Sequence, residues 1–122
     1  MSSPRRVLIV DDSMMSMRQL ECTLLGLGGY QIIGHARNGA EAIRLYCDLS
    51  PDVVCMDIVM PLLDGLQALR SILQIDAQAK VIMVSSVGGA RDRAVEALRL
   101  GAKSVIAKPY DDEAIRTALD AL

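Results

Sequence analysis

The amino-acid sequence predicts an α/β fold, a doubly wound sheet of five parallel strands with five helices on its two faces. Short apolar runs alternate along the chain with segments of helical periodicity, the order typical of this class. The run 53–56 is apolar at every position between turn formers, as in a strand buried on both faces. A buried helical turn would show the same pattern. Asp57 favours the strand, because a carboxylate at its end must lie at a sheet edge near water, a cation or hydrogen-bond donors.

Composition limits the kind of protein. The 122 residues are 52% hydrophobic with a net charge of −2, which argues for one folded domain, 1–122, and gives no reason to expect nucleic-acid binding. No apolar run approaches the roughly 20 residues of a membrane span, and no signal peptide is visible. Cys22, Cys47 and Cys55 lack metal-ligand spacing and are interpreted as reduced thiols of a cytoplasmic protein. With no Phe or Trp, the core must be aliphatic and rich in Met.

The first half of the chain carries clear start and stop signals. Ser13 can cap a helix that Gly28-Gly29 end, and Asn38-Gly39 open the next helix. The predicted elements are a strand at 5–10, a helix at 13–27, a strand at 30–36, a helix at 38–49 and a strand at 52–57.

The second half continues the alternation. Asp64-Gly65 are interpreted as turn residues that initiate a helix, without a catalytic role. The predicted elements are a helix at 62–75, a strand at 80–84, a helix at 90–100, a strand at 103–107 and a helix at 111–122. The acidic start of the last helix complements the positive end of its dipole.

Polar residues follow four of the predicted strands: Asp11-Asp12, Asp57, Ser85 and Lys108. The carboxyl ends of parallel strands share one sheet edge, so these side chains can form one pocket. Asp11-Asp12 alone would fit an exposed turn and Lys108 alone a loop, but these separate explanations would require four independent strand ends to imitate the same pocket. Three close carboxylates repel one another unless one is protonated or a cation such as Mg²⁺ intervenes. A carboxylate can attack phosphorus to form an aspartyl phosphate, and Lys108 and Ser85 can then contact the phosphoryl oxygens.

Five fragments resemble the response-regulator receiver family, specifically the stand-alone CheY chemotaxis type: VLIVDDS, ARNGAEA, PDVVCMDIVMPLLDG, VIMVSS and GAKSVIAKPY. The resemblance covers the whole chain and implies a flavodoxin-like fold with strand order 2-1-3-4-5. It also implies roles for particular residues: Asp57 as phospho-acceptor and metal ligand, Asp12 as direct Mg²⁺ ligand, Asp11 as ligand through water, the Val59 carbonyl as a further ligand, Ser85 as switch hydroxyl, Lys108 as phosphoryl-binding residue and a cis bond before Pro109.

The function implied by the resemblance is a signalling switch, not an enzyme beyond its own phosphoryl transfer and hydrolysis. A histidine kinase would phosphorylate Asp57, and a partner protein, in chemotaxis or motility, would read residues 85–93 or the face formed by 90–100, 103–107 and the last helix. A monomer or weak dimer is expected, without nucleic-acid or membrane binding. The alternatives are a receiver cut from a larger regulator and an Mg²⁺-dependent phosphatase, whose general acid–base would stand where this chain has Val59. A third alternative is a flavodoxin-like cofactor binder. Such a protein would need phosphate-binding loop residues at the positions where this chain has acidic residues.

The sequence departs from the family pattern at several positions. Val105 replaces the usual aromatic residue of strand five, and 85–101 is one residue longer than is typical, which leaves Ser86 as a rival to Ser85. Separately, Val59 and Val87 resemble the family positions that flank the path of attacking water. Both are apolar here, which predicts a long-lived aspartyl phosphate.

Other side chains receive structural interpretations. Met14, Met15 and Met17 are expected to fill the core, and His35 is expected to lack a partner cluster. Five further basic residues could form either a face that binds a partner or an ordinary solvated helix surface: Arg91, Arg93, Arg99, Lys103 and Arg116.

Overall fold

The computed structural model describes residues 3–85 and 91–122. Its strands are Arg5–Val10 (β1), Tyr30–Ala36 (β2), Val53–Asp57 (β3), Val81–Ser85 (β4) and Ser104–Ala107 (β5). Its helices are Met14–Leu27 (α1), Gly39–Leu49 (α2), Gly65–Ile75 (α3), Arg91–Leu100 (α4) and Asp112–Asp120 (α5).

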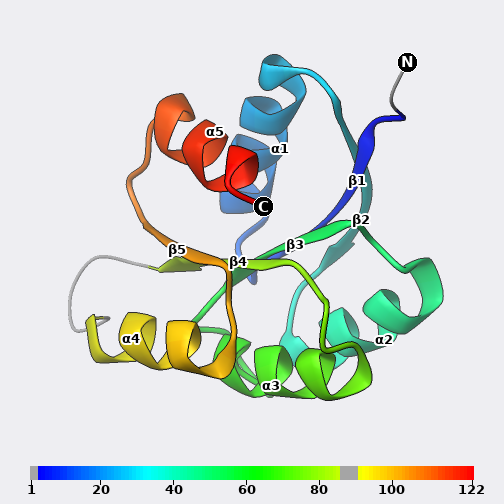
Figure 1. Ribbon diagram of the computed structural model, residues 1–122, viewed down its shortest axis with the longest axis vertical. Helices are drawn as coiled ribbons and strands as arrows, with labels where there is room; N and C mark the ends of the chain where they lie inside the picture. Colours follow the sequence, from blue (N-terminus) through cyan, green and yellow to red (C-terminus); the bar gives the residue numbers. More distant parts are fainter. Residues whose placement is uncertain (1–2, 86–90) are drawn as a thin grey trace.

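The strands form one parallel sheet in the order β2-β1-β3-β4-β5. Figure 1 shows α1 and α5 on one face of this sheet and α2, α3 and α4 on the other. The predicted fold class and strand order are therefore confirmed. None of the helices in the described ranges is both long and apolar enough to span a bilayer.

Alternation along the strands divides the core into two layers. Val7 and Ile9 of β1 pack with α1 and α5, whereas Leu8 and Val10 pack with the helices of the opposite face. Successive side chains of a strand point to opposite faces, and both faces are covered, so the central strands are apolar throughout. As expected without Phe or Trp, methionine contributes to this core: the buried methionines are Met17, Met56, Met60 and Met83.

Element ends differ from the predictions by a few residues. The helix predicted from residue 62 begins at Gly65, because Leu62 has a left-handed backbone (φ 67°) and Asp64 forms a capping box with Gln67. β4 extends to Ser85, β5 begins at Ser104 rather than 103, and α5 ends at Asp120 instead of 122. The predicted start of α4 at Ala90 lies outside the described residues.

Candidate functional site

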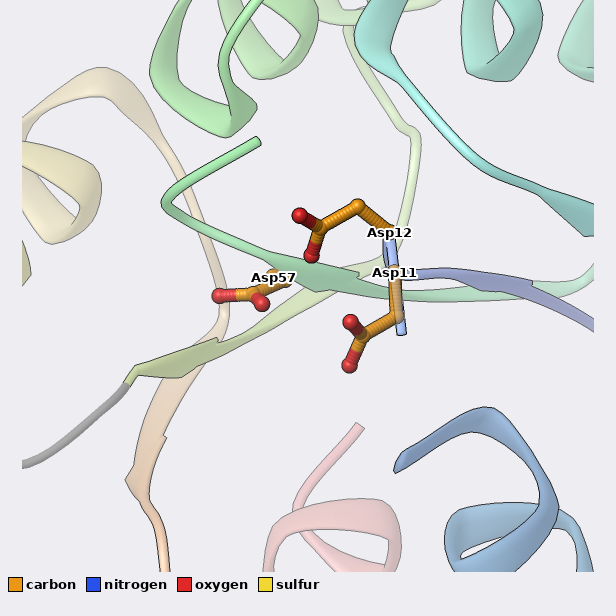
Figure 2. Close-up of side chains that lie close together, drawn as sticks. All are labelled: Asp11, Asp12 and Asp57. Atoms are coloured by element: carbon orange, nitrogen blue, oxygen red, sulfur yellow. The ribbon is translucent and has the colours of Figure 1, made fainter. Parts of the chain in front are cut away.

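The carboxyl ends of neighbouring strands bring the predicted site residues together. Asp57 is the last residue of β3, and Asp11 and Asp12 directly follow β1, the strand that pairs with β3. Figure 2 shows the three aspartates side by side at this edge of the sheet. A carboxylate oxygen from each lies within 4.8 Å of the others. The sheet therefore assembles an acidic cluster from residues that are more than forty positions apart.

Burial makes the Asp57 carboxylate difficult to ionise. Its residue is only 5% exposed. Desolvation, with further contributions from the charges of Asp11 and Asp12, raises the pKa of Asp57 above its ordinary value. Lys108 and the hydrogen bond from the Val59 N–H to Asp57 Oδ1, at 3.3 Å, oppose this increase without cancelling it. Asp57 thus lies where added positive charge would favour its ionised, nucleophilic form.

Lys108 connects two of the aspartates. Its Nζ donates to Asp11 Oδ2 at 2.9 Å and lies 3.5 Å from Asp57 Oδ2. Burial alone would lower the pKa of Lys108, but the hydrogen bond to Asp11 and the charges of Asp57 and Asp11 together raise it. The ammonium is therefore charged and lies against the candidate acceptor. Its closer contact, with Asp11, was not foreseen from the sequence.

Asp11 and Asp12 occupy different environments. Asp11 is buried, and its carboxylate accepts hydrogen bonds from both Lys108 and the Ser13 N–H, the latter at 2.9 Å. Asp12 is exposed, and no hydrogen bond to its carboxylate occurs among residues 3–85 and 91–122. Because its oxygens remain available, Asp12 fits a direct ligand better than Asp11 does.

The donor set fits a hard divalent cation. Three carboxylates within 4.8 Å form the oxygen-rich, negatively charged cluster that Mg²⁺ prefers. The proposed contribution of the Val59 carbonyl stays a prediction, since the contact present is between the Val59 amide and Asp57. The cluster identifies which residues would hold such an ion: Asp11, Asp12 and Asp57.

Ser85 is the buried end of β4, 5% exposed, beside the last residue of β5 in the sheet register. Its carbonyl accepts a 2.7 Å hydrogen bond from the backbone N–H of Lys108, so the ends of β4 and β5 are joined at the site. The peptide bond between Lys108 and Pro109 is cis, as the resemblance implied. The rival switch residue Ser86, together with Val87 and Gly88-Gly89, lies outside the described residues.

The loop between β3 and α3 is packed tightly against the acceptor. The Gly65 N–H donates to the Ile58 carbonyl at 2.7 Å, and a Cβ at Gly65 would collide with the Asp57 carbonyl oxygen. The Gly39 N–H donates to the Leu63 carbonyl at 2.9 Å, where a Cβ would also collide. Both glycines thus permit close backbone approach, a role that the sequence interpretation did not assign to Gly39.

One structural interpretation is wrong for two of its three residues. Met17 is buried, but Met14 and Met15 are 53% and 81% exposed, because the buried face of α1 is formed by Met17, Leu20 and Leu24. His35, which was interpreted as structural, contacts one carboxylate: its Nε2 lies 2.6 Å from Glu21 Oε1, across the exposed surface between α1 and β2.

Other predictions about single residues agree with the structure. Cys55 is buried, Cys22 and Cys47 are exposed, and all three thiols are free. Four of the five basic residues of the suggested partner face are exposed, while the side chain of Arg91 lies outside the described part: Arg93, Arg99, Lys103 and Arg116.

The fold and the site define the class: a doubly wound α/β domain with a carboxylate cluster, a lysine and a hydroxyl at the carboxyl edge of its sheet. Residues 7–120 match the response regulator receiver domain. The chain therefore belongs to the receiver-domain family of two-component response regulators.

Relatives include both short and long proteins. The chain is 42% identical over 115 residues to the chemotaxis protein CheY of Bacillus subtilis, with 94% of each chain covered. It is 43% identical over 107 residues to protein-glutamate methylesterase/protein-glutamine glutaminase 5 of Myxococcus xanthus, covering 88% of this chain but 31% of that protein. Among solved structures, the CheX-CheY-BeF3-Mg²⁺ complex from Borrelia burgdorferi matches with a TM-score of 0.89 and 36% identity, covering 96% of this chain and 87% of that one.

Proposed function

We propose that this chain is a phosphorylation-controlled switch in which Asp57 accepts a phosphoryl group from a histidine kinase. The observation that supports this proposal most strongly is the position of Asp57. It is buried at the end of β3, lies 3.5 Å from the Lys108 ammonium and is next to Asp11 and Asp12. Kinship with CheY proteins supports a role in chemotaxis or motility, and a cytoplasmic location is part of the proposal.

The chemistry is an in-line displacement. A carboxylate oxygen of Asp57 attacks phosphorus, the bond from phosphorus to the histidine nitrogen breaks, and the electron pair remains on the imidazole. Lys108 and the Ser85 hydroxyl can contact the transferred group, which supplies charge neutralisation and positioning. Mg²⁺ held by Asp11, Asp12 and Asp57 would neutralise further charge on the phosphoryl oxygens. The Borrelia CheY in complex with BeF3 and Mg²⁺ supports this assignment, since BeF3 resembles a phosphoryl group.

The output partner is a protein that reads the segment 85–93 or the face of α4, β5 and α5. A surface groove of about 620 Å³ runs along β5 and α5 and is lined in part by Val105, Ile106 and Thr117. This groove offers a partner access to β5, the strand that ends next to Lys108 of the site. A monomer or weak dimer is proposed for the free chain.

A hydrolytic enzyme is the second candidate, because phosphatases can also use an aspartyl phosphate. Val59, two residues beyond Asp57, cannot act as the general acid–base that such an enzyme needs. The switch therefore predicts one phosphoryl group per chain, whereas a phosphatase would release phosphate over many turnovers.

Incubation with acetyl phosphate and Mg²⁺ tests the proposal. Intact-mass spectrometry should show one added phosphoryl group on the wild type and none on Asp57→Asn. The asparagine side chain has nearly the same shape, so the variant should retain its fold, which circular dichroism can verify. Equal labelling of the variant would disprove the role of Asp57.

A further inference from the structure

The side chain of Asp57 lies on the face of the sheet that α1 and α5 cover (Figure 1). Val53 and Cys55 of β3 pack in the core layer beneath these two helices. Asp57 follows Cys55 by two positions, so the alternation of a strand places it on the same face. A small hollow of about 10 Å³ agrees with this placement, because both Cys55 and Asp57 line it. The hollow has room for about one water molecule at most. The acceptor therefore has a tightly packed inner side as well as an open edge.

Tyr110 forms the wall between this hollow and the surface. It lines the hollow together with Asp57 and Lys108, and it also lines the groove of about 620 Å³ along β5 and α5. Within residues 3–85 and 91–122, Tyr110 is the single residue that borders both spaces. Its side chain therefore separates the inner side of the acceptor from the open groove.

The ring of Tyr110 is held in its position. It is half-buried and packs against the core layer beneath α1 and α5. The next residue, Asp111, caps α5 by accepting the Ala114 N–H at 2.9 Å. Burial raises the pKa of Tyr110 to about 12, with further contributions from nearby negative charges that include Asp11. The phenol is therefore neutral at physiological pH, and a neutral, packed ring can exclude water from the hollow.

The groove on the outer side of Tyr110 is bordered mainly by small side chains. Four of its lining residues are alanines: Ala107, Ala114, Ala118 and Ala121. A methyl group is too small to fill the space that a missing phenol ring would leave. Truncation of Tyr110 would therefore connect the hollow beside Asp57 to the solvent in the groove.

Water in the hollow would lie next to the carboxyl group of Asp57. An aspartyl phosphate can be hydrolysed by attack on phosphorus or by attack on the carboxyl carbon. Attack on phosphorus needs water in line with the breaking bond, on the side away from Asp57. In attack on carbon, the water oxygen bonds to the carboxyl carbon and the bond from that carbon to the bridging oxygen breaks. Phosphate leaves with the electron pair and one proton of the water, and the other proton goes to solvent.

We infer that Tyr110 shields the carboxyl carbon of phosphorylated Asp57 from water and thereby restricts hydrolysis to attack on phosphorus. The inference rests on the proposed function and names a residue that controls the lifetime of the phosphorylated state. This residue acts on the inner side of the acceptor, whereas Val59 lies in the loop between β3 and α3.

The fate of the water oxygen tests the inference. The chain is phosphorylated once with acetyl phosphate and Mg²⁺ and then transferred to ¹⁸O-labelled water. Attack on phosphorus places the label in inorganic phosphate, and attack on carbon places it in the Asp57 carboxylate, where mass spectrometry of the peptide detects it. Tyr110→Ala should release phosphate about ten-fold faster, with most of the label in Asp57. Tyr110→Phe keeps the ring, so it should preserve the wild-type rate and the label in phosphate.

Tyr30→Ala is the matched control. Tyr30 is also half-buried and packed against the core layer beneath α1 and α5, but it begins β2, at the opposite edge of the sheet from Asp57. Its truncation removes the same ring from the same core layer without opening the hollow. The rate and the position of the label should therefore match the wild type.

Three results would overturn the inference while leaving Asp57 as acceptor. They are an unchanged rate for Tyr110→Ala, faster release with the label only in phosphate, and label in Asp57 of Tyr30→Ala as well, which would assign the effect to lost stability. If circular dichroism shows that Tyr110→Ala is unfolded, Tyr110→Val decides by the same criteria. Failure of acetyl phosphate to label the wild type would reject the proposed function, and the inference with it.

Discussion

At the scale of single residues, the lysine of the site has two partners rather than one. Lys108 Nζ is 2.9 Å from Asp11 and 3.5 Å from Asp57. Phosphorylation would place new negative charge beside Asp57, so the ammonium can move toward the phosphoryl group with a short displacement. Its hydrogen bond to Asp11 keeps it charged and oriented before the donor arrives.

Val59 predicts a slowly hydrolysed aspartyl phosphate. Its side chain is 54% exposed beside Asp57, and an isopropyl group can neither orient a water molecule nor accept its proton. Val59→Asn should accelerate phosphate loss on the order of ten-fold, below the roughly 10²–10⁴ of full general acid–base catalysis, because an amide only orients the water.

Release of radiolabelled phosphate from the purified phosphoprotein measures this rate, with Val59→Ala as the control for side-chain size. Adding Val87→Glu, at a position outside the described residues, should increase the rate further. An unchanged or slower release from the double variant would contradict the role of these two positions.

At the scale of secondary-structure elements, β4 and β5 should respond unequally to phosphorylation. Val105 of β5 is β-branched, restricted at its first side-chain torsion and packed on the core. Ser85 ends β4 at the site, where a phosphoryl oxygen can accept a charge-assisted hydrogen bond from its hydroxyl. We expect the signal to leave through the β4–α4 connection.

Amide chemical shifts with and without BeF3 and Mg²⁺ test this expectation. Changes should be larger for residues 85–93 than for 103–106. Asp57→Asn under the same conditions shows the effect of the reagents alone. Larger changes centred on Val105 than on the residues after Ser85 would refute the prediction.

At the scale of the whole molecule, the free energy of unfolding should depend on the charge of the site. The pKa of Asp57 is raised above its ordinary value of 3.8, so the folded chain binds this proton more tightly than the unfolded chain. The associated stabilisation is complete below 3.8 and is lost as pH rises through the raised pKa. Without metal at pH 7, Asp57→Asn should therefore be more stable than the wild type.

Mg²⁺ should reverse this loss, because it binds the folded cluster. Ten times its Kd would add about 1.4 kcal/mol to the free energy of unfolding, and Asp12→Ala should reduce the gain most. Urea unfolding at several pH values, with EDTA or Mg²⁺, measures both effects. A wild type indifferent to millimolar-range Mg²⁺ would argue against the metal site.

Local patterns determined most of the fold and the composition of the site. Strand and helix periodicities, with caps such as Ser13 and Asp64, depend on residues near in sequence. Asp57 could be placed at a strand end because an apolar run cannot accommodate an unpaired carboxylate in its middle. The common edge of a parallel sheet then brought Asp11, Asp57 and Lys108 together without knowledge of any distance.

Only the tertiary structure decided which of those residues contact one another, how deeply each is buried and which side chains surround them. The contact of Lys108 with Asp11 spans 97 positions, and the two adjacent aspartates differ in burial, with Asp11 buried and Asp12 exposed. Likewise, the exposure of Met14 and the left-handed backbone of Leu62 follow from the positions of α1 and of the loop held by Gly39. Hydrophobic periodicity indicates on which face of a helix or strand a side chain lies. Distances between side chains, their burial and backbone strain instead arise when elements that are distant in sequence pack against one another.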